Sequence, residues 1–323
     1  MRTVTIEEHA AVPELWEAIG SNMPPAMQAI LEDMGDGRLA DMDAHGIDMQ
    51  VLSMQPPWDD ADPDKTYKAV RAFNEAARAA VEAHPDRFQF LAAVPLHDPN
   101  EAARELERGV RELGAKGALL GTRMTTGFMS EEVNWPFWEA AEGLGVPVYM
   151  HPGLPPKVVK DTYYADLGPV VGTGMSTAIW GWHVDTGMHT IRLILRGVFD
   201  RFPKLQVIIG HMGEAIPFMM GRLEERFAGI AASLAGFELP FEKPSIRDYF
   251  KSNIHITTSG FFDHESLQCA VSVLGADRII FAVDYPFSLN VDGRKFIDSA
   301  PLGEAEREAI AHGNAERLLE LST

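Results

Sequence analysis

Short runs of apolar residues recur along the chain, and each is followed by polar residues or by glycine and proline. Runs of this length that are rich in β-branched residues predict buried strands. Eight are present: TVTIEE, MQVLSM, FQFLAAVPL, GALLG, VPVYMH, QVIIGH, IHITTS and IIFAVDY. Between them, apolar residues recur with helical spacing, which predicts helices at 65–84, 100–113, 136–144, 186–202, 214–227, 263–274 and 304–319.

Strands that alternate with helices favour parallel pairing, and eight such units favour a closed barrel. A doubly wound open sheet is the main alternative, but no GxGxxG sequence follows any predicted strand. We therefore predict an α/β fold, a (β/α)8 TIM barrel, as a single domain over residues 1–323. The length of 323 residues is compatible with one such domain.

Two intervals are longer than simple barrel connections. Residues 10–45 separate the first two predicted strands, and residues 152–185, which are rich in Pro, Gly, Tyr and Trp, follow the fifth. Both leave the carboxyl ends of strands, which is the side where barrel enzymes build their active sites. We expect these insertions to be lids or subunit contacts within the one domain.

The balance of charges narrows the choice of partners. With 28 Lys and Arg against 47 Asp and Glu, the net charge is −19, which disfavours nucleic acid and anionic membranes. No apolar stretch approaches the roughly 18 residues of a membrane span, and no secretory signal is evident. The single cysteine, Cys269, excludes an intrachain disulfide. We expect a cytoplasmic protein with a small-molecule partner, without nucleic acid and without a membrane.

Ionisable side chains stand where several predicted strands end, and these ends meet at one mouth in a barrel. They are Glu7 and His9 after the first strand, His151 after the fifth, His211 and Glu214 after the sixth, and Asp284 after the eighth. Glu7 and His9 are two residues apart, so alternation puts their side chains on one face. Glu8 is then expected to point outward, under the helices or into a salt bridge.

A set of carboxylates and imidazoles suits a divalent ion such as Zn, Mn or Fe(II). The alternative is that each residue is a separate buried polar group with its own hydrogen bonds. One histidine after a strand is most simply explained that way, whereas the whole set favours a metal site. His183, in IWGWHVD, is a further candidate for the pocket lining.

Longer stretches include these residues with their neighbours: IEEHA, RLADMDAHGIDMQVLS, HPDRFQFLAAVPLHDP, YMHPG, GVFDRFPKLQVIIGHMGEAIPFMMGRL, ITTSG and DRIIFAVDYPF. Through them the chain resembles the amidohydrolase superfamily over nearly its whole length. It is most similar to the ACMSD-like, metal-dependent aromatic-acid decarboxylases, whose substrates include resorcylates and dihydroxybenzoates. The segments at 122–135 and 153–185 depart from that pattern, and they would set the substrate.

The resemblance implies a role for each matching position. It implies Glu7, His9, His151 and Asp284 as metal ligands, His211 as the active-site histidine, Glu214 as its supporting carboxylate, and Arg222 and Phe287 as residues that shape the pocket. In hydrolytic members the metal-ligand motif after the first strand is usually His-x-His. Here Glu7 takes the first position of that motif, as in the decarboxylase branch. The fourth strand ends GALLGTR without the lysine of binuclear members. One divalent ion, Mn or Zn, is therefore implied.

The reaction implied is non-oxidative decarboxylation of an ortho-hydroxy aromatic acid, in which protonation of the ring precedes loss of CO2. Asp284 is the expected proton donor, with His211 as its partner. Each pocket residue keeps an alternative: core packing for Phe287, a surface salt bridge for Arg222 and a subunit contact for Trp182. A metal-dependent hydrolase of a lactone or amide, a hydratase and a non-catalytic barrel that binds a small acid remain as alternatives. We expect a homodimer or homotetramer.

Overall fold

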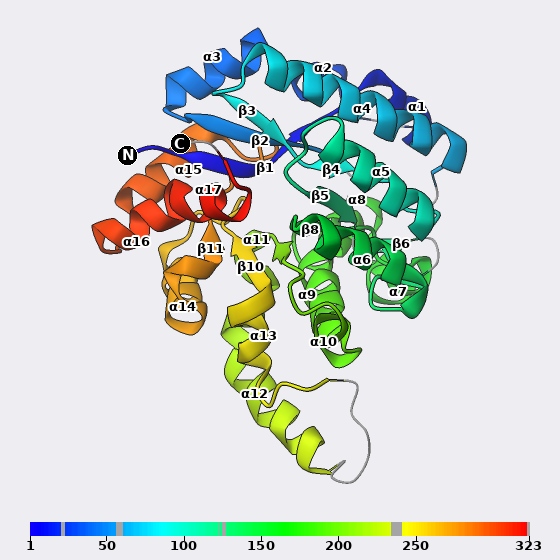
Figure 1. Ribbon diagram of the computed structural model, residues 1–323, viewed down its shortest axis with the longest axis vertical. Helices are drawn as coiled ribbons and strands as arrows, with labels where there is room; N and C mark the ends of the chain where they lie inside the picture. The colour runs from blue at the N-terminus through cyan, green and yellow to red at the C-terminus, as the bar shows by residue number, and fades with distance from the viewer. Residues whose placement is uncertain (21–22, 56–60, 122, 125–126, 234–240, 322–323) are drawn as a thin grey trace.

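The protein, seen here in a computed structural model, is a barrel of parallel strands surrounded by helices (Figure 1). The structure describes residues 1–20, 23–55, 61–121, 123–124, 127–233 and 241–321. Parallel strands pair in the orders β1-β2-β3 and β4-β5-β8-β9-β10-β11. Their bounds are Val4–Ala10 (β1), Met49–Met54 (β2), Phe88–Phe90 (β3), Ala92–Ala93 (β4), Ala118–Gly121 (β5), Val148–His151 (β8), Val207–Ile209 (β9), Ile254–Thr257 (β10) and Ile279–Ile280 (β11).

Backbone hydrogen bonds close these two sheets into one barrel. The Leu91 N–H between β3 and β4 donates to the Leu52 carbonyl of β2 at 2.9 Å, so β3 and β4 form one interrupted strand. The Ile6 N–H of β1 donates to the Phe281 carbonyl just after β11 at 3.2 Å. All eight predicted strands take part, and the predicted barrel is confirmed. A short antiparallel hairpin, β6 (Arg123–Met124) and β7 (Gly127–Phe128), lies outside it.

The main helices cover the outside of the barrel, near their predicted positions. They are α4 (Pro63–Ala83), α5 (Pro99–Arg111), α6 (Trp135–Leu144), α9 (Gly181–Leu195), α10 (Val198–Arg201), α12 (Ile216–Ser233) and α14 (His264–Leu274). Asp62 and Asp98 cap α4 and α5, because each carboxylate accepts backbone N–H groups of the first turn and a proline follows it. No helix in the described ranges is long and apolar enough to cross a bilayer.

Some helix predictions differ from the structure. The helix predicted over 186–202 is split, because Gly197 takes a left-handed conformation with φ +69° between α9 and α10. The helix predicted over 304–319 is three pieces: α16 (Glu304–Glu308), a π-helical turn (Ala309–Gly313) and α17 (Asn314–Leu318). Two further helices, α13 (Ile246–Asn253) and α15 (Asn290–Ser299), were not predicted, because their apolar patterns are short.

Both insertions contain short helices. The first contains α1 (Pro13–Ile19), α2 (Pro25–Glu32) and α3 (Asp36–His45), and the second contains α7 (Lys157–Tyr163), a 3₁₀ turn (Ala165–Leu167) and α8 (Pro169–Ser176). Arg38 of α3 is buried and donates from Nη2 to the His9 carbonyl at 2.6 Å. The first insertion is therefore packed against the end of β1. Roles of the insertions as lids or subunit contacts stay predictions, as does the single-domain boundary.

The apolar core has two parts, one inside the barrel and one between its strands and the helices. Val4, Ile6, Val51, Leu119 and Ile208 belong to the inner part, and all are buried. The outer part includes alternate residues of the same strands together with the inner faces of the helices. This division follows the two-residue period of a strand that is covered on both faces.

Candidate active site

The in–out alternation of side chains along β1 is interrupted near the end of the strand. Val4 and Ile6 pack inside the barrel, so strict alternation would place Glu8 inside and Glu7 outside. The register between β1 and β2 shifts between Ile6 and Glu8, and Glu7 has φ +68°. This bulge turns Glu7 and His9 toward the barrel mouth and Glu8 away from it. The expected shared face of Glu7 and His9 is confirmed, but a bulge produces it.

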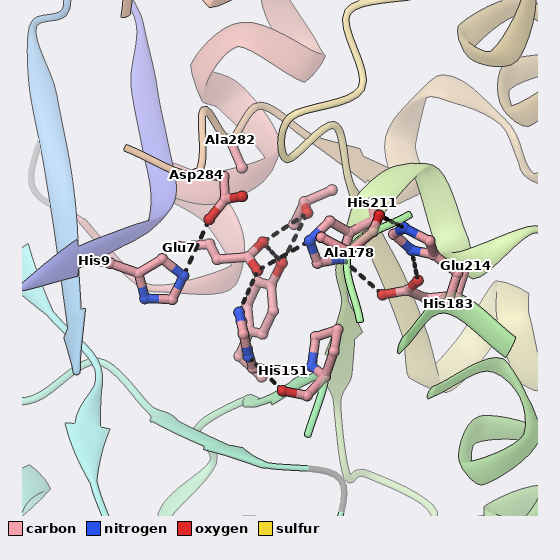
Figure 2. Close-up of polar contacts among 12 residues, drawn as sticks. Glu7, His9, His151, Ala178, His183, His211, Glu214, Ala282 and Asp284 are labelled. Atoms are coloured by element: carbon pink, nitrogen blue, oxygen red, sulfur yellow. Dashed lines mark hydrogen bonds and ion pairs between the residues drawn. The ribbon is translucent and has the colours of Figure 1, made fainter. Parts of the chain in front are cut away.

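Four of the predicted residues meet at the mouth. One ligand atom each from Glu7, His9, His151 and Asp284 lies within 4.8 Å of the others. His9 Nε2 is 3.1 Å from Asp284 Oδ1, and His151 Nε2 is 3.4 Å from Glu7 Oε1. Figure 2 shows Glu7 between the His9–Asp284 pair and a second group formed by His211, Glu214 and His183.

Neighbouring groups orient two of these side chains. The Tyr149 hydroxyl donates a hydrogen bond to Glu7 Oε2 and lies 2.9 Å from Thr257 Oγ1. His151 Nδ1 lies 2.8 Å from the Pro152 carbonyl, which accepts its proton and leaves the Nε2 lone pair toward Glu7. One oxygen of Glu7 and one nitrogen of His151 are thus held in place by the protein.

Several atoms facing the mouth are buried without a hydrogen bond. In the described parts of the chain, Glu7 Oε1 and both ring nitrogens of His9 find no hydrogen-bond partner. A buried polar atom without a partner is costly, so such atoms call for an explanation. Two carboxylates and two imidazoles are a donor set that divalent Mn or Zn accepts. The residues present therefore fit a metal ion.

His211, Glu214 and His183 form a connected group beside the metal-ligand candidates. His211 Nδ1 is 2.8 Å from Glu214 Oε1, and His183 Nδ1 is 2.7 Å from Glu214 Oε2. His183 Nε2 is 2.9 Å from the Ala178 carbonyl. The backbone of this turn, α11 (His211–Glu214), is left-handed, with φ +47° at His211 and +54° at Glu214. Glu214 thus precedes α12 and does not start that helix as predicted.

Burial and charge set the proton affinities of the buried site residues. Burial raises the pKa of Glu7 to about 6, and burial lowers the pKa of His151 well below its ordinary value. Burial also opposes charge on His211, but the carboxylates of Glu214 and Glu7 outweigh it and raise the pKa of His211 to about 10. Although burial opposes charge on Glu214 too, His211 and the hydrogen bond from His183 lower its pKa. His211 and Glu214 are therefore an ion pair at neutral pH.

A cavity of about 330 Å³ opens at this mouth. Its lining includes His151, His211, Asp284, Trp182, His183, Phe287, Gln55, Ala178, Ser259, Gly260, Phe261 and Ser288. The Phe287 ring lies edge-on to His9, with ring centroids 5.6 Å apart. Aromatic walls beside a polar floor suit a flat ring that carries polar substituents.

Three of the four predicted pocket residues line the cavity, and the fourth does not. Phe287, Trp182 and His183 do line the cavity, although both ring nitrogens of His183 already face protein acceptors. Arg222 does not: it lies on the exposed face of α12 and pairs with Glu225 at 3.0 Å. This arrangement matches the alternative of a surface salt bridge, and a contact of Arg222 with substrate stays a prediction. The segment at 122–135, which departs from the family pattern, lies partly outside the described residues.

Several site residues were not singled out from the sequence. Gln55 and Ser259 follow the ends of β2 and β10, so the strand-end rule that found His151 could have found them. Tyr149 lies two residues before His151, and strand alternation therefore places it on the same face. Phe261 lies in a loop, and no local pattern points to it.

Comparison with known proteins gives consistent results. A family model described as amidohydrolase matches residues 8–321. The γ-resorcylate decarboxylase of Rhizobium radiobacter is 37% identical over 339 aligned residues, with 98% of each chain covered. The solved 5-carboxyvanillate decarboxylase of Sphingomonas paucimobilis superimposes with a TM-score of 0.90 at 32% identity over 99% of both chains.

A third relative was solved with a metal. The dihydroxybenzoic acid decarboxylase of a Polaromonas species, with bound manganese and the inhibitor 2-nitroresorcinol, has a TM-score of 0.87 and 34% identity. The match covers 99% of this chain and 97% of that one. Because the family model spans nearly the whole chain and full-length relatives exceed 30% identity, the protein belongs to the amidohydrolase family.

Proposed function

We propose that the protein is a metal-dependent, non-oxidative decarboxylase of an ortho-hydroxy aromatic acid of the dihydroxybenzoate or resorcylate type. The observation that carries this is the convergence of Glu7, His9, His151 and Asp284 at the mouth, where Glu7 Oε1 and the ring nitrogens of His9 make no hydrogen bond to any described residue, next to a cavity with aromatic walls. The full-length likeness to decarboxylases of such acids supports it.

Glu7, His9, His151 and Asp284 would hold one divalent ion, Mn or Zn. The manganese in the Polaromonas structure favours Mn. A bound ion would act as a Lewis acid and as a template for the carboxylate and hydroxyl oxygens of the substrate. Tyr149 keeps Glu7 in one orientation, and the Pro152 carbonyl keeps His151 in one tautomer, so both ligands are preorganised.

Asp284 is the residue that we assign as proton donor. Its side chain is 17% exposed and lines the cavity, whereas Glu7 is fully buried. Transfer of its proton to the ring carbon that bears the carboxylate forms a C–H bond and interrupts aromaticity. The electron pair of the carbon–carbon bond then returns to the ring as CO2 leaves. This order avoids an aryl carbanion.

His211 restores the proton on Asp284. The Glu214 carboxylate holds Nδ1 of His211 at 2.8 Å and favours the protonated form of the ring. Phe287 and Trp182 exclude water from one side of the ring and orient it.

The test is a decarboxylation screen. Metal is removed, Mn or Zn is restored, and a panel of ortho-hydroxy aromatic acids is followed by ultraviolet absorbance and CO2 release. Metal-dependent CO2 release from at least one acid is expected. A metal-loaded protein that is inactive on every acid but hydrolyses a lactone or amide contradicts the proposal and favours the hydrolase. Double-bond hydration without CO2 release favours the hydratase.

We also propose that the chain forms a homodimer or homotetramer. Large apolar side chains are exposed on α8, α9 and α12; Val170 and Phe218 are each 83% exposed, and Trp180 just before α9 is 51% exposed. A monomer rarely leaves so many large apolar side chains in water. Light scattering on the purified protein tests this, and a monomer at micromolar concentration contradicts it.

A further inference from the structure

Glu8 is a buried carboxylate that none of the steps above uses. It is fully buried and turned away from the cavity by the bulge in β1. This is the outward direction, under the helices, that was expected as one of two possibilities. There Glu8 Oε1 accepts the Val283 N–H at 2.9 Å, and Oε2 accepts the Tyr285 N–H at 3.1 Å. These are the backbone amides on either side of Asp284.

The backbone that Glu8 holds is not relaxed. Asp284 has φ +69°, a left-handed conformation that is unfavourable for a residue with a side chain. Such a conformation persists only where the surroundings impose it. The segment that contains Asp284 is also tied to β1 by the His9 N–H, which donates to the Tyr285 carbonyl at 2.7 Å.

Arg38 also holds the contact between the end of β1 and the segment after β11. It is 1% exposed, and it donates from Nη2 to the His9 carbonyl at 2.6 Å. Its guanidinium lies over the Tyr285 ring, 4.9 Å from the centroid. The backbone of His9 is thus bonded through both its N–H and its carbonyl. Glu8 and Arg38 together tie the end of β1 to the segment after β11.

We propose that Glu8 is a positioning residue, which fixes Asp284 for proton transfer by holding the amides on either side of it. Arg38 fixes the neighbouring His9 in the same way. This role rests on the proposed function, in which Asp284 supplies the proton. The proton donor must approach the ring carbon closely, and a displacement of about 1 Å costs roughly 100-fold in rate.

The decisive variant is Glu8→Gln. Glutamine has the same shape but only one acceptor oxygen, so its NH2 group faces one of the two N–H donors and displaces the segment. We expect kcat to fall about 10–100-fold, as for other groups that orient catalytic ligands, with KM changed far less. Glu8→Asp keeps both acceptor oxygens but is one methylene too short to reach both amides, and we expect an intermediate loss of kcat.

Glu105→Gln is the matched control. Glu105 is also a buried carboxylate, 3% exposed, and accepts from Asn74 and Arg108 at 2.7 Å, but it lies in α5 and does not line the cavity. Metal content, melting temperature, kcat and KM are measured for all variants. The electron paramagnetic resonance spectrum of bound Mn(II) is expected to change in Glu8→Gln and to keep the parent shape in Glu105→Gln.

These measurements distinguish a failure of the role proposed for Glu8 from a failure of the proposed function. If Glu8→Gln and Glu105→Gln lose similar stability but both keep the parent's kcat per bound metal ion, Glu8 only stabilises the fold and the proposal is overturned. If Glu8→Gln does not fold, Glu8→Asp decides by the same criterion. If the parent protein releases CO2 from no acid, the proposed function fails. The Mn(II) spectrum then still decides on Glu8, and an unchanged spectrum in both variants overturns its role.

Discussion

The floor of the barrel and its mouth are both buried, but they differ in composition and in backbone. The floor is filled by aliphatic residues such as Val4, Ile6 and Ile208, on regular parallel strands. The mouth is filled by carboxylates and imidazoles. Among the described residues, seven non-glycine residues have positive φ, and all but Glu320 lie at the mouth: Glu7, His211, Met212, Glu214, Ala215 and Asp284.

Two buried histidines, one at the mouth and one near the floor, show how nearby charges set the pKa of a buried side chain. His211 at the mouth lies beside the carboxylates of Glu214 and Glu7, which raise its pKa to about 10. His255 is the second residue of β10, near the floor, where burial and the positive charges of Arg278 and Arg317 lower its pKa to about 3. Burial opposes the charged form in both cases, so the sign of the nearby charge makes the difference.

This difference indicates that the floor mainly supplies stability and the mouth mainly supplies the functional groups. Aliphatic packing on regular strands supplies stability at the floor. The mouth contains strained backbone and buried polar atoms that make no hydrogen bond to the described residues, which cost stability and are characteristic of functional sites. Substitutions at the mouth should therefore change activity and metal binding, whereas substitutions at the floor should change stability alone.

The largest effect is expected for Asp284→Asn. The amide cannot donate the proton that we assign to Asp284, so turnover should fall by about 10²–10⁴-fold or become undetectable. Binding of a chelating inhibitor, measured by calorimetry on the metal-loaded variant, should remain. An Asp284→Asn protein with parent-like turnover removes Asp284 as proton donor.

Glu7→Ala should weaken metal binding. It removes one of four ligand atoms, so the loss should exceed the roughly 10–100-fold that follows from changes in supporting residues. Mass spectrometry of the bound metal after dialysis measures it, and Glu105→Gln serves as a control that should keep full occupancy. Full occupancy with normal activity in Glu7→Ala contradicts the ligand assignment.

His255 should make the fold sensitive to acid. Below its ordinary pKa of 6.5 the unfolded chain gains a proton that folded His255 does not accept until about pH 3. Stability is therefore unaffected by this group above pH 6.5 and falls as the pH decreases, by about 2 kcal/mol at pH 5. Urea unfolding at pH 7.5 and pH 5 measures the change. His255→Leu should show a smaller decrease, and an identical decrease would argue against this account.

The smallest effect is expected at the floor. Ile208 is fully buried in the inner core, so Ile208→Val should lower the free energy of unfolding by about 1 kcal/mol. Activity per folded molecule and metal content should stay at the parent level. A clear loss of kcat in this variant would show that the floor and the mouth are not separate in function.

Local patterns along the chain are sufficient to predict the strands and the residues at their ends. A run of apolar residues is a local signal, and residues that follow such runs in a barrel must meet at its carboxyl side. These two facts are enough to group Glu7, His9, His151 and Asp284 at one site. They also include His211 and Glu214 in it, although helical periodicity wrongly places Glu214 inside the following helix.

The details that give this mouth its chemistry depend on tertiary contacts. The bulge at Glu7 depends on the register between β1 and β2, and the partners of Glu8 lie on a segment at the other end of the chain. Arg222 has a motif that matches the family, but the orientation of α12 points it to solvent. Each of these results depends on contacts between residues far apart in sequence, which local periodicity does not encode.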